Sequence, residues 1–535
     1  MQGLMMDEPL LISSLIKHAA MNYADKGVVS RETDGTLVRL TYREVEARAR
    51  SLAGWLGALG ITSGDKVGTI AWNTHRHLEL YYASSGMGAI CHTVNPRLAP
   101  EDVAFILRDA GTKIVFLDDT FIPLVEAVAA EDTPVETWVI MTGSGTKPNG
   151  YFLDYETGLG TVTAITDWPE FEENTAAGLC YTSGTTGKPK GVLYSHRSTV
   201  LHALASAAPN VLDIAERDIV MPVVPMFHVN AWGIPHIAPM SGATIVMPGA
   251  ALDGENLAAL MQEEKVTFAA GVPTIWHGLM EHLKTSSMRL PLLERCIVGG
   301  SALPEVMTRY FEDEQDIAMY QGWGMTETSP ICTISKLSGS DAKLSRDEQV
   351  RKKARQGKAV FPIQMKILSD DGNRLGWDDR TCGELFVRGP WIAKTYAGFE
   401  EDKILIDGWF ATGDIVKIDQ TGSVKITDRA KDIIKSGGEW ISSIELEDIA
   451  LSHNGVGQVA VIGVPDSKWG ERPMMIYVPA DINPVNDKAL HAFLSERLPK
   501  WQLPEHYRTV DALPLGATGK ILKTKLRELF EEGVS

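Results

Sequence analysis

The segment YTSGTTGKPKG occupies residues 181 to 191 and directly follows the apolar run AAGLC. Its glycines allow the backbone to fold tightly, so that successive N–H groups can face one anion. Hydroxyl donors and positive charge are added by Thr182, Ser183, Thr185, Thr186, Lys188 and Lys190. The stretch therefore predicts a polyphosphate site. Its spacing differs from that of a Walker A loop, because Gly184 and Gly187 stand too close together.

Strand-length apolar runs alternate with helical patterns from about residue 30 to about residue 400. The clearest example predicts a strand at 243–249, a helix at 257–265, a strand at 266–273 and a helix at 275–283. This alternation is typical of an α/β fold with a mostly parallel sheet. Ligands in such folds bind at loops that follow the carboxyl ends of strands, so we expect the functional loops there.

The pattern changes near residue 428 to short strands, helices and turns. We therefore expect an N-terminal domain over residues 1–428. A smaller α+β domain is expected over residues 429–535, and the short connection predicts that it moves as a lid or hinged unit.

The composition is that of an ordinary globular protein, with 44% apolar and 22% charged residues in 535. A formal net charge of -18 argues against nucleic acid or an anionic membrane as the main partner. The five cysteines are widely spaced and lack a CxxC pattern, so neither a disulfide framework nor a zinc site is predicted. The apolar part of the first twenty residues is too short to span a membrane and predicts an amphipathic helix.

Further blocks follow the phosphate-binding segment in a fixed order. They are PMFHVNAWG (225–233), GGSALP (299–304), YQGWGMTETSP (320–330), GWFATGD (408–414), DRAKDIIKSGGEWIS (428–442) and LPLGATGKILKTKLR (513–527). Over its whole length the chain resembles the adenylate-forming superfamily of acyl- and aryl-CoA synthetases, peptide-synthetase adenylation domains and luciferases. The resemblance implies a large N-terminal α/β domain, a mobile C-terminal domain, and the use of ATP, Mg²⁺ and coenzyme A.

The resemblance assigns the ATP site to three of these blocks. The loop at 182–190, with Gly184 and Gly187, would hold the β- and γ-phosphates. In GWGMTET, Trp323 would lie beside adenine, Thr326 would contact the α-phosphate, and Glu327 would bind Mg²⁺ as a carboxylate ligand. In GGSALP, Gly299, Gly300 and Ser301 would allow close approach of adenine and the acyl chain.

Two further residues are implied for the ribose. Asp414 would accept hydrogen bonds from both ribose hydroxyls, and Arg429 would contact the ribose or a phosphate. Outside such blocks, either residue would be interpreted as a surface charge.

The acyl pocket is assigned to PMFHVNAWG. His228 lies where relatives place an aromatic ring or histidine near the substrate carboxylate, and it is either catalytic or a pocket-lining residue. Trp232 would form a wall of the acyl site. A bulky indole at this position favours a short or medium acid.

Lys520 is the residue to which the resemblance assigns adenylation. A lysine offsets the negative charge that develops when a carboxylate attacks the α-phosphate. Lys431 would be the hinge about which the small domain rotates for the thioester step. After rotation the pantetheine arm would pass Gly437 and Gly438, at an entrance shaped by Lys435 and Trp440.

Several alternatives share these motifs. An adenylation enzyme that loads a carrier protein commonly sits beside a carrier domain, which we do not expect here. A luciferase-like oxygenase would consume oxygen, and a nucleotide-binding regulator would have no need for Lys520, Glu327 and Asp414 together.

The substrate is less sharply indicated than the reaction. The opening LLISSLIKHAA and the AWNTHRHLELYY and VNPRL segments resemble the subgroup of medium-chain acyl-CoA synthetases and 3-methylmercaptopropionate-CoA ligases. We rank 3-methylmercaptopropionate with C4 to C8 acids, ahead of aryl and long-chain acids. The expected protein is a cytoplasmic ligase without a transmembrane segment or nucleic-acid partner, with a homodimer as one possible assembly.

Overall fold

The computed structural model describes the chain except for residues 2, 142–151, 183–187, 400–403, 438, 481–482, 516–520 and 531–535. The chain forms two compact units, and each is described by itself. The first comprises Met1–Thr182, Pro189–Gln364 and Arg388–Phe410, and the second comprises Ser183–Lys188, Met365–Val387 and Ala411–Ser535. The boundary expected near residue 428 separates a fixed N-terminal domain from a mobile C-terminal domain. It stays a prediction.

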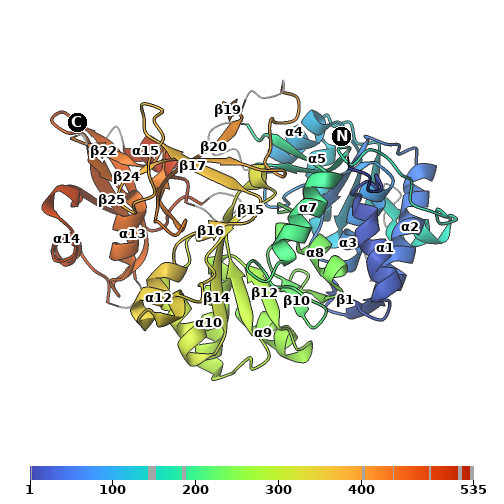
Figure 1. Cartoon of the computed structure of the whole chain (residues 1–535), viewed down its shortest axis with the longest axis horizontal. Coiled ribbons are helices and arrows are strands. Elements are labelled where there is room, and N and C mark those ends of the chain that lie inside the picture. The colour runs from blue at the N-terminus through green and yellow to red at the C-terminus, as the bar shows by residue number, and fades with distance from the viewer. Residues whose placement is uncertain are drawn as a thin grey trace. The chain divides into compact units, whose positions relative to one another are not determined.

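A nine-stranded, mostly parallel sheet carries the central part of the first unit. Its strands, in spatial order, are β16 (Lys358–Ala359), β15 (Ile331–Ile334), β14 (Ala318–Gly324), β13 (Arg295–Val298), β12 (Phe268–Gly271), β10 (Ile219–Pro222), β11 (Thr244–Met247), β1 (Gly27–Arg31) and β2 (Leu37–Thr41). The predicted alternation is confirmed, because α9 (Gly254–Glu263) and α10 (Pro273–Ser286) connect β11 to β12 and β12 to β13. Figure 1 shows these two helices beside β12 and β14.

Local chemistry explains where these helices begin. The Asp253 side chain accepts a hydrogen bond from the Asn256 N–H and so caps α9. Pro273 starts α10, where its missing N–H costs nothing. One face of the sheet is buried by the apolar sides of α9, α10 and α11 (Glu305–Arg309), with Trp276 and Phe311 among the fully buried side chains.

A second sheet of the same unit has seven strands, all parallel except for its last. Their order is β7 (Phe152–Asp154), β6 (Thr137–Met141), β5 (Thr112–Asp118), β3 (Lys66–Ile70), β4 (Ile90–Thr93), β8 (Ala176–Tyr181) and β9 (Gly191–Ser195). Helices cover both faces, as continuous apolar strands require. The remaining helices of this unit are α1 (Ile12–Asn22), α2 (Tyr42–Ala58), α3 (His75–Gly86), α4 (Pro100–Ala110), α5 (Ile122–Ala129), α6 (Tyr155–Gly160), α7 (His196–Ala207), α8 (Ile234–Ser241) and α12 (Arg346–Lys353).

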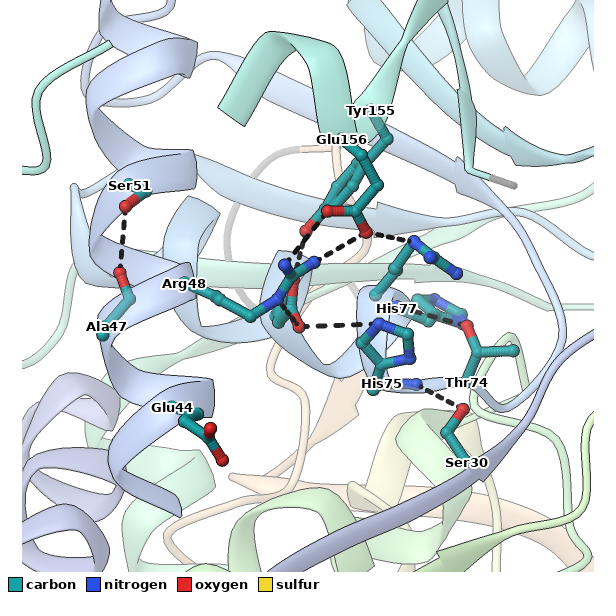
Figure 2. A network of polar contacts seen from close by, with 12 residues as sticks. Ser30, Glu44, Ala47, Arg48, Ser51, Thr74, His75, His77, Tyr155 and Glu156 are labelled. Atoms are coloured by element: carbon teal, nitrogen blue, oxygen red, sulfur yellow. Dashed lines mark hydrogen bonds and ion pairs between the residues drawn. The ribbon is translucent and has the colours of Figure 1, made fainter. Parts of the chain in front are cut away.

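A buried charge network joins α2, α3 and α6 to the residue that follows β1. Arg48 contacts Glu79 at 2.7 Å and Glu156 at 2.8 Å, and Arg76 contacts Glu156 at 2.8 Å. Arg76 also forms an ion pair with Glu32. Figure 2 shows Arg48, Glu156, Tyr155 and His75 gathered in this network. The buried carboxylates of Glu32 and Glu79 therefore each have a guanidinium partner, as low-dielectric surroundings require, and so does the partly exposed Glu156.

The second unit contains two sheets. One consists of β17 (Gln364–Leu368), β18 (Gly383–Arg388), β20 (Trp409–Ile418) and β21 (Val424–Arg429), and β19 (Leu405–Ile406) pairs with the beginning of β20. The other consists of β23 (Glu439–Ile441), β22 (Ile434–Ser436), β25 (Gly470–Pro479), β24 (Val456–Asp466) and β26 (His506–Thr509). Helices α13 (Ser443–Leu451) and α14 (Asp487–Ser495) bury one face of the latter, and α15 (Lys523–Phe530) packs on the other. The predicted α+β character of the C-terminal hundred residues is confirmed.

In the described part of the chain, no helix is both long and apolar enough to cross a bilayer.

Candidate active site

The predicted phosphate-binding segment connects two antiparallel strands, β8 and β9. At its base the Thr182 N–H donates to the Lys190 carbonyl at 2.9 Å, and the Lys190 N–H donates to Thr182 Oγ1 at 3.3 Å. The structure therefore brings these two predicted residues together at the neck of the loop. Lys188 is exposed. The other predicted loop residues, Ser183, Gly184, Thr185, Thr186 and Gly187, lie outside the described residues.

The Thr326–Glu327 pair lies in a short turn that follows β14, as expected for a functional loop at the carboxyl end of a strand. The Tyr194 hydroxyl donates to the Thr326 carbonyl at 2.8 Å. The Glu327 carbonyl accepts from the Ala393 N–H at 2.8 Å, and the Tyr396 hydroxyl donates to Glu327 Oε1 at 2.7 Å. The turn is thus held by contacts on both its backbone and its carboxylate.

Glu327 is a buried acidic side chain, only 6% exposed. Among the described residues, no lysine, arginine or histidine lies within ion-pair distance of its carboxylate, and Oε2 accepts no protein hydrogen bond. A cation close to a buried carboxylate would stabilise its ionised form. The site fits Mg²⁺, which commonly takes one or two protein carboxylates and completes its shell with substrate phosphates. In the described ranges, no group of three or more His, Cys, Asp or Glu side chains is arranged to hold a metal ion.

The predicted acyl wall and the glycine block are in contact. A Cβ placed on Gly299, after β13, would lie 2.8 Å from the Trp232 ring, so only glycine fits beside this indole. Gly300 has a φ of +83°, which also favours glycine. Trp232 and Trp323 are both buried, whereas Ser301 is exposed.

Trp232 belongs to an unusual left-handed turn. Residues 229–232 have φ values between 26° and 56°, and Gly233 follows at 82°. Left-handed conformations cost non-glycine residues energy and require support from their surroundings. Part of that support is the Tyr81 hydroxyl, which donates to Asn230 Oδ1 at 3.0 Å and to the Met226 carbonyl at 2.7 Å. His228, at the start of this turn, is half-buried.

In the second unit, the predicted ribose-binding residues lie side by side on adjacent strands. Asp414 of β20 is paired in register with Arg429 of β21, and their side chains form an ion pair at 3.0 Å. Asp414 is 1% exposed, whereas the Arg429 guanidinium is partly exposed. A carboxylate held by a neighbouring guanidinium is oriented to accept further hydrogen bonds.

The predicted thioester segment forms the β22–β23 hairpin of the second unit. The Lys435 ammonium lies 5.6 Å from the Trp440 ring centroid. Gly437 has a φ of +61°, and a Cβ there would meet Trp469 at 2.8 Å. The Lys431 carbonyl accepts a hydrogen bond from Arg527 at 3.2 Å. Gly438 and Lys520 lie outside the described residues.

Sequence reasoning missed the tyrosines that surround the Thr326–Glu327 turn. Tyr194 follows the phosphate loop within β9, and Tyr396 lies in the irregular stretch IAKTYAGF after β18. A single tyrosine in such a loop does not indicate, from sequence alone, that it contacts a residue as distant in the chain as Glu327 is from Tyr396. Only the fold brings both beside Glu327.

Comparison with known proteins gives matches over nearly the whole chain. Residues 16–397 match the family of AMP-binding enzymes, and residues 445–520 match its C-terminal domain. The chain is 47% identical to a 3-methylmercaptopropionyl-CoA ligase of Ruegeria lacuscaerulensis, with all of both chains covered. It is 44% identical to a medium-chain-fatty-acid–CoA ligase of Ectopseudomonas oleovorans, covering 99% of this chain and 98% of that one.

A solved structure shares the fold. The o-succinylbenzoate coenzyme A synthetase of Bacillus subtilis, in complex with ATP and magnesium ion, superposes with a TM-score of 0.79 at 25% identity. The match covers 96% of this chain and 99% of that chain.

Proposed function

We propose that this chain, which belongs to the AMP-binding enzyme family and has the fold of its acyl-AMP-forming CoA ligases, joins a short or medium carboxylic acid to coenzyme A at the expense of ATP. The buried carboxylate of Glu327, with no cation beside it among the described residues, is the structural observation that carries the proposal. The relatives' activities support the reaction type.

In the first half-reaction, one oxygen of the acid attacks the α-phosphorus of ATP, the bond to the β-phosphate breaks, and pyrophosphate leaves. Thr182 and Lys190 would hold the leaving phosphates at the neck of the loop. The Thr326 hydroxyl would contact the α-phosphate. When bound, Mg²⁺ would neutralise phosphate charge, and Glu327 would hold it.

Asp414, oriented by Arg429, would accept the ribose hydroxyls and fix the nucleotide for in-line attack. Lys520 would stabilise the charge that develops on the phosphoryl oxygens. His228 would line the carboxylate pocket or contact the reacting carboxylate.

In the second half-reaction, the thiol of coenzyme A loses its proton and attacks the acyl carbon, and AMP leaves with the oxygen that came from the acid. Rotation about Lys431 would bring the Lys435–Trp440 hairpin to the acyl-AMP. Gly437 and Gly438 would admit the narrow pantetheine arm, because they carry no side chain.

Two arms of one experiment test the reaction. The purified protein is incubated with acid, ATP and Mg²⁺, with and without coenzyme A, and acyl-AMP and acyl-CoA are measured by mass spectrometry. Lys520→Ala should lose acyl-AMP formation by on the order of a hundredfold or more, while converting supplied acyl-AMP to acyl-CoA. Equal loss of both half-reactions would contradict the role of Lys520.

The proposal of a short or medium acid rests on the Trp232 indole, which packs directly against Gly299 and would limit the length of the acyl site. A panel of 3-methylmercaptopropionate and straight-chain C4 to C12 acids should give the highest kcat/KM for the thioether acid and the C4 to C8 acids. Trp232→Gly should move this preference toward longer acids, because each methylene buried in the vacated space contributes about 0.8 kcal/mol. A uniform loss at every chain length would show that Trp232 is only a scaffold residue.

Three controls separate the alternatives. Light emission or oxygen consumption would indicate a luciferase-like oxygenase, transfer to a carrier protein in preference to coenzyme A would indicate a loading enzyme, and nucleotide binding without product would indicate a regulator. A cytoplasmic location and a homodimer are proposals from the resemblance alone. Cell fractionation and light scattering test them.

A further inference from the structure

The segment 391–399 crosses the candidate active site of the first unit and is fixed at three points. The Ser329 hydroxyl donates to the Trp391 carbonyl at 2.7 Å, and the Ala393 N–H donates to the Glu327 carbonyl. The Ala397 N–H donates to the Gly191 carbonyl at 2.8 Å. The segment is therefore attached both to the turn that carries Glu327 and to the strand that leaves the phosphate loop.

Tyr396 lies between the last two of these points and contacts both neighbouring elements with its side chain. Its hydroxyl donates to Glu327 Oε1 at 2.7 Å. Its ring centroid lies 5.0 Å from the Lys190 ammonium, a distance at which a cation is attracted to an aromatic face. One side chain thus contacts the candidate metal ligand and a candidate phosphate-binding lysine.

The Tyr396 hydroxyl is the donor in this contact, because the Glu327 carboxylate oxygen can only accept. A hydroxyl bound to Oε1 restricts rotation of the carboxylate and leaves Oε2 available to a ligand.

We propose that Tyr396 is a positioning residue for adenylation, which orients the Glu327 carboxylate toward a nucleotide-bound divalent cation and holds Lys190 beside it. The inference rests on the proposed function, because it assumes that Glu327 binds the metal. Groups that hydrogen-bond to metal ligands commonly change metal affinity by about 10- to 100-fold when removed. The ring and the hydroxyl have separable tasks, so two substitutions can distinguish them.

Tyr396→Phe removes the hydroxyl and keeps the ring over Lys190. The Mg²⁺ concentration that gives half-maximal acyl-AMP formation should rise about tenfold or more, since the freed carboxylate must be ordered by the metal. Tyr396→Leu removes the ring as well, and it should add an increase in KM for ATP. Conversion of supplied acyl-AMP to acyl-CoA uses no ATP, so both variants should keep it.

A binding measurement gives a readout that does not depend on turnover. Mn²⁺ is titrated calorimetrically into full-length protein saturated with α,β-methylene-ATP, which cannot be cleaved at the α-phosphate. Tyr396→Phe should weaken Mn²⁺ binding by about the same factor as the Mg²⁺ requirement.

Tyr155→Phe is the matched control. The Tyr155 hydroxyl also donates to a buried carboxylate, Glu79 Oε2, at 2.6 Å in the same unit, but within the charge network. This control should lower stability and leave the metal requirement unchanged.

The positioning role is overturned if Tyr396→Phe binds Mn²⁺ as the unsubstituted protein does, or if its two half-reactions fall in parallel. It is also overturned if Tyr155→Phe raises the metal requirement equally. If the unsubstituted protein forms acyl-AMP with none of the tested acids, the proposed function itself fails. That result is distinct from the others.

Discussion

Two regions of the first unit bury carboxylates in different ways. In the charge network, Glu32 has Arg76, Glu79 has Arg48, and Glu156 has both arginines. In the candidate active site, the comparably buried Glu327 has a tyrosine hydroxyl and no cation among the described residues. The network thus pairs its own charges, and we propose that a bound cation supplies the missing charge beside Glu327.

The pKa of Glu32 shows how strongly its neighbours in the network stabilise the buried carboxylate. Burial by itself would raise the pKa of Glu32, but the hydrogen bond and charge of His75 and the charge of Arg76 lower it to about 2. Glu32 therefore stays ionised under all ordinary conditions and contributes to stability. The paired carboxylates of the network stabilise the fold, and we propose that the carboxylate of Glu327 instead recruits a cation.

The largest expected effect comes from breaking the network at Arg76. Arg76→Leu leaves Glu32 ionised and buried without its guanidinium, which should lower the free energy of unfolding by about 3–5 kcal/mol. Denaturant unfolding of the full-length protein measures this. The double variant, which also carries Glu32→Leu, should recover much of the lost free energy of unfolding. A loss below about 1 kcal/mol in the single variant would show that the Arg76–Glu32 ion pair does not stabilise the fold.

The reverse pattern is expected at Glu327. Glu327→Gln keeps the shape and an acceptor for Tyr396 but removes the charge, so acyl-AMP formation should fall by on the order of a hundredfold. Stability should be equal or higher, because an uncompensated buried charge is gone. Glu32→Gln provides the matched control, and it should lose stability instead of adenylation. If both variants lose stability alike, the comparison between the two regions is wrong.

A smaller effect concerns Asp118, at the end of β5, which lies near the network but lacks an arginine partner among the described residues. Burial raises the pKa of Asp118 to about 8, although the hydrogen bond from Trp72 opposes this. Because the folded state then binds a proton that the unfolded state releases above about pH 4, stability should fall as pH rises from 4 to 8.

Asp118→Asn removes this dependence. Relative to the unsubstituted protein, the variant should gain about 1 kcal/mol of unfolding free energy between pH 6 and pH 7, measured by denaturant unfolding at both values. A difference that does not change with pH would show that Asp118 is ionised in the folded protein.

Local sequence was sufficient for the α/β alternation from β11 to β14, because capping residues and apolar periodicity act over a few residues. The resemblance assigned both Gly299 and Trp232 to the substrate site, and the structure brings these two residues into contact. The left-handed turn at 229–232 could not be predicted, because no glycine marks its first four residues and its support comes from Tyr81, far away in the chain. Tyr396 was missed for the same reason.

The path of the substrate oxygen tests the acyl-AMP mechanism most directly. The acid is supplied with ¹⁸O in both carboxylate positions, together with ATP, Mg²⁺ and coenzyme A, and the products are analysed by mass spectrometry. If the acid attacks the α-phosphorus, the AMP released on thioester formation carries one labelled oxygen, and pyrophosphate carries none. Labelled inorganic phosphate with ADP would indicate an acyl-phosphate route and contradict the account.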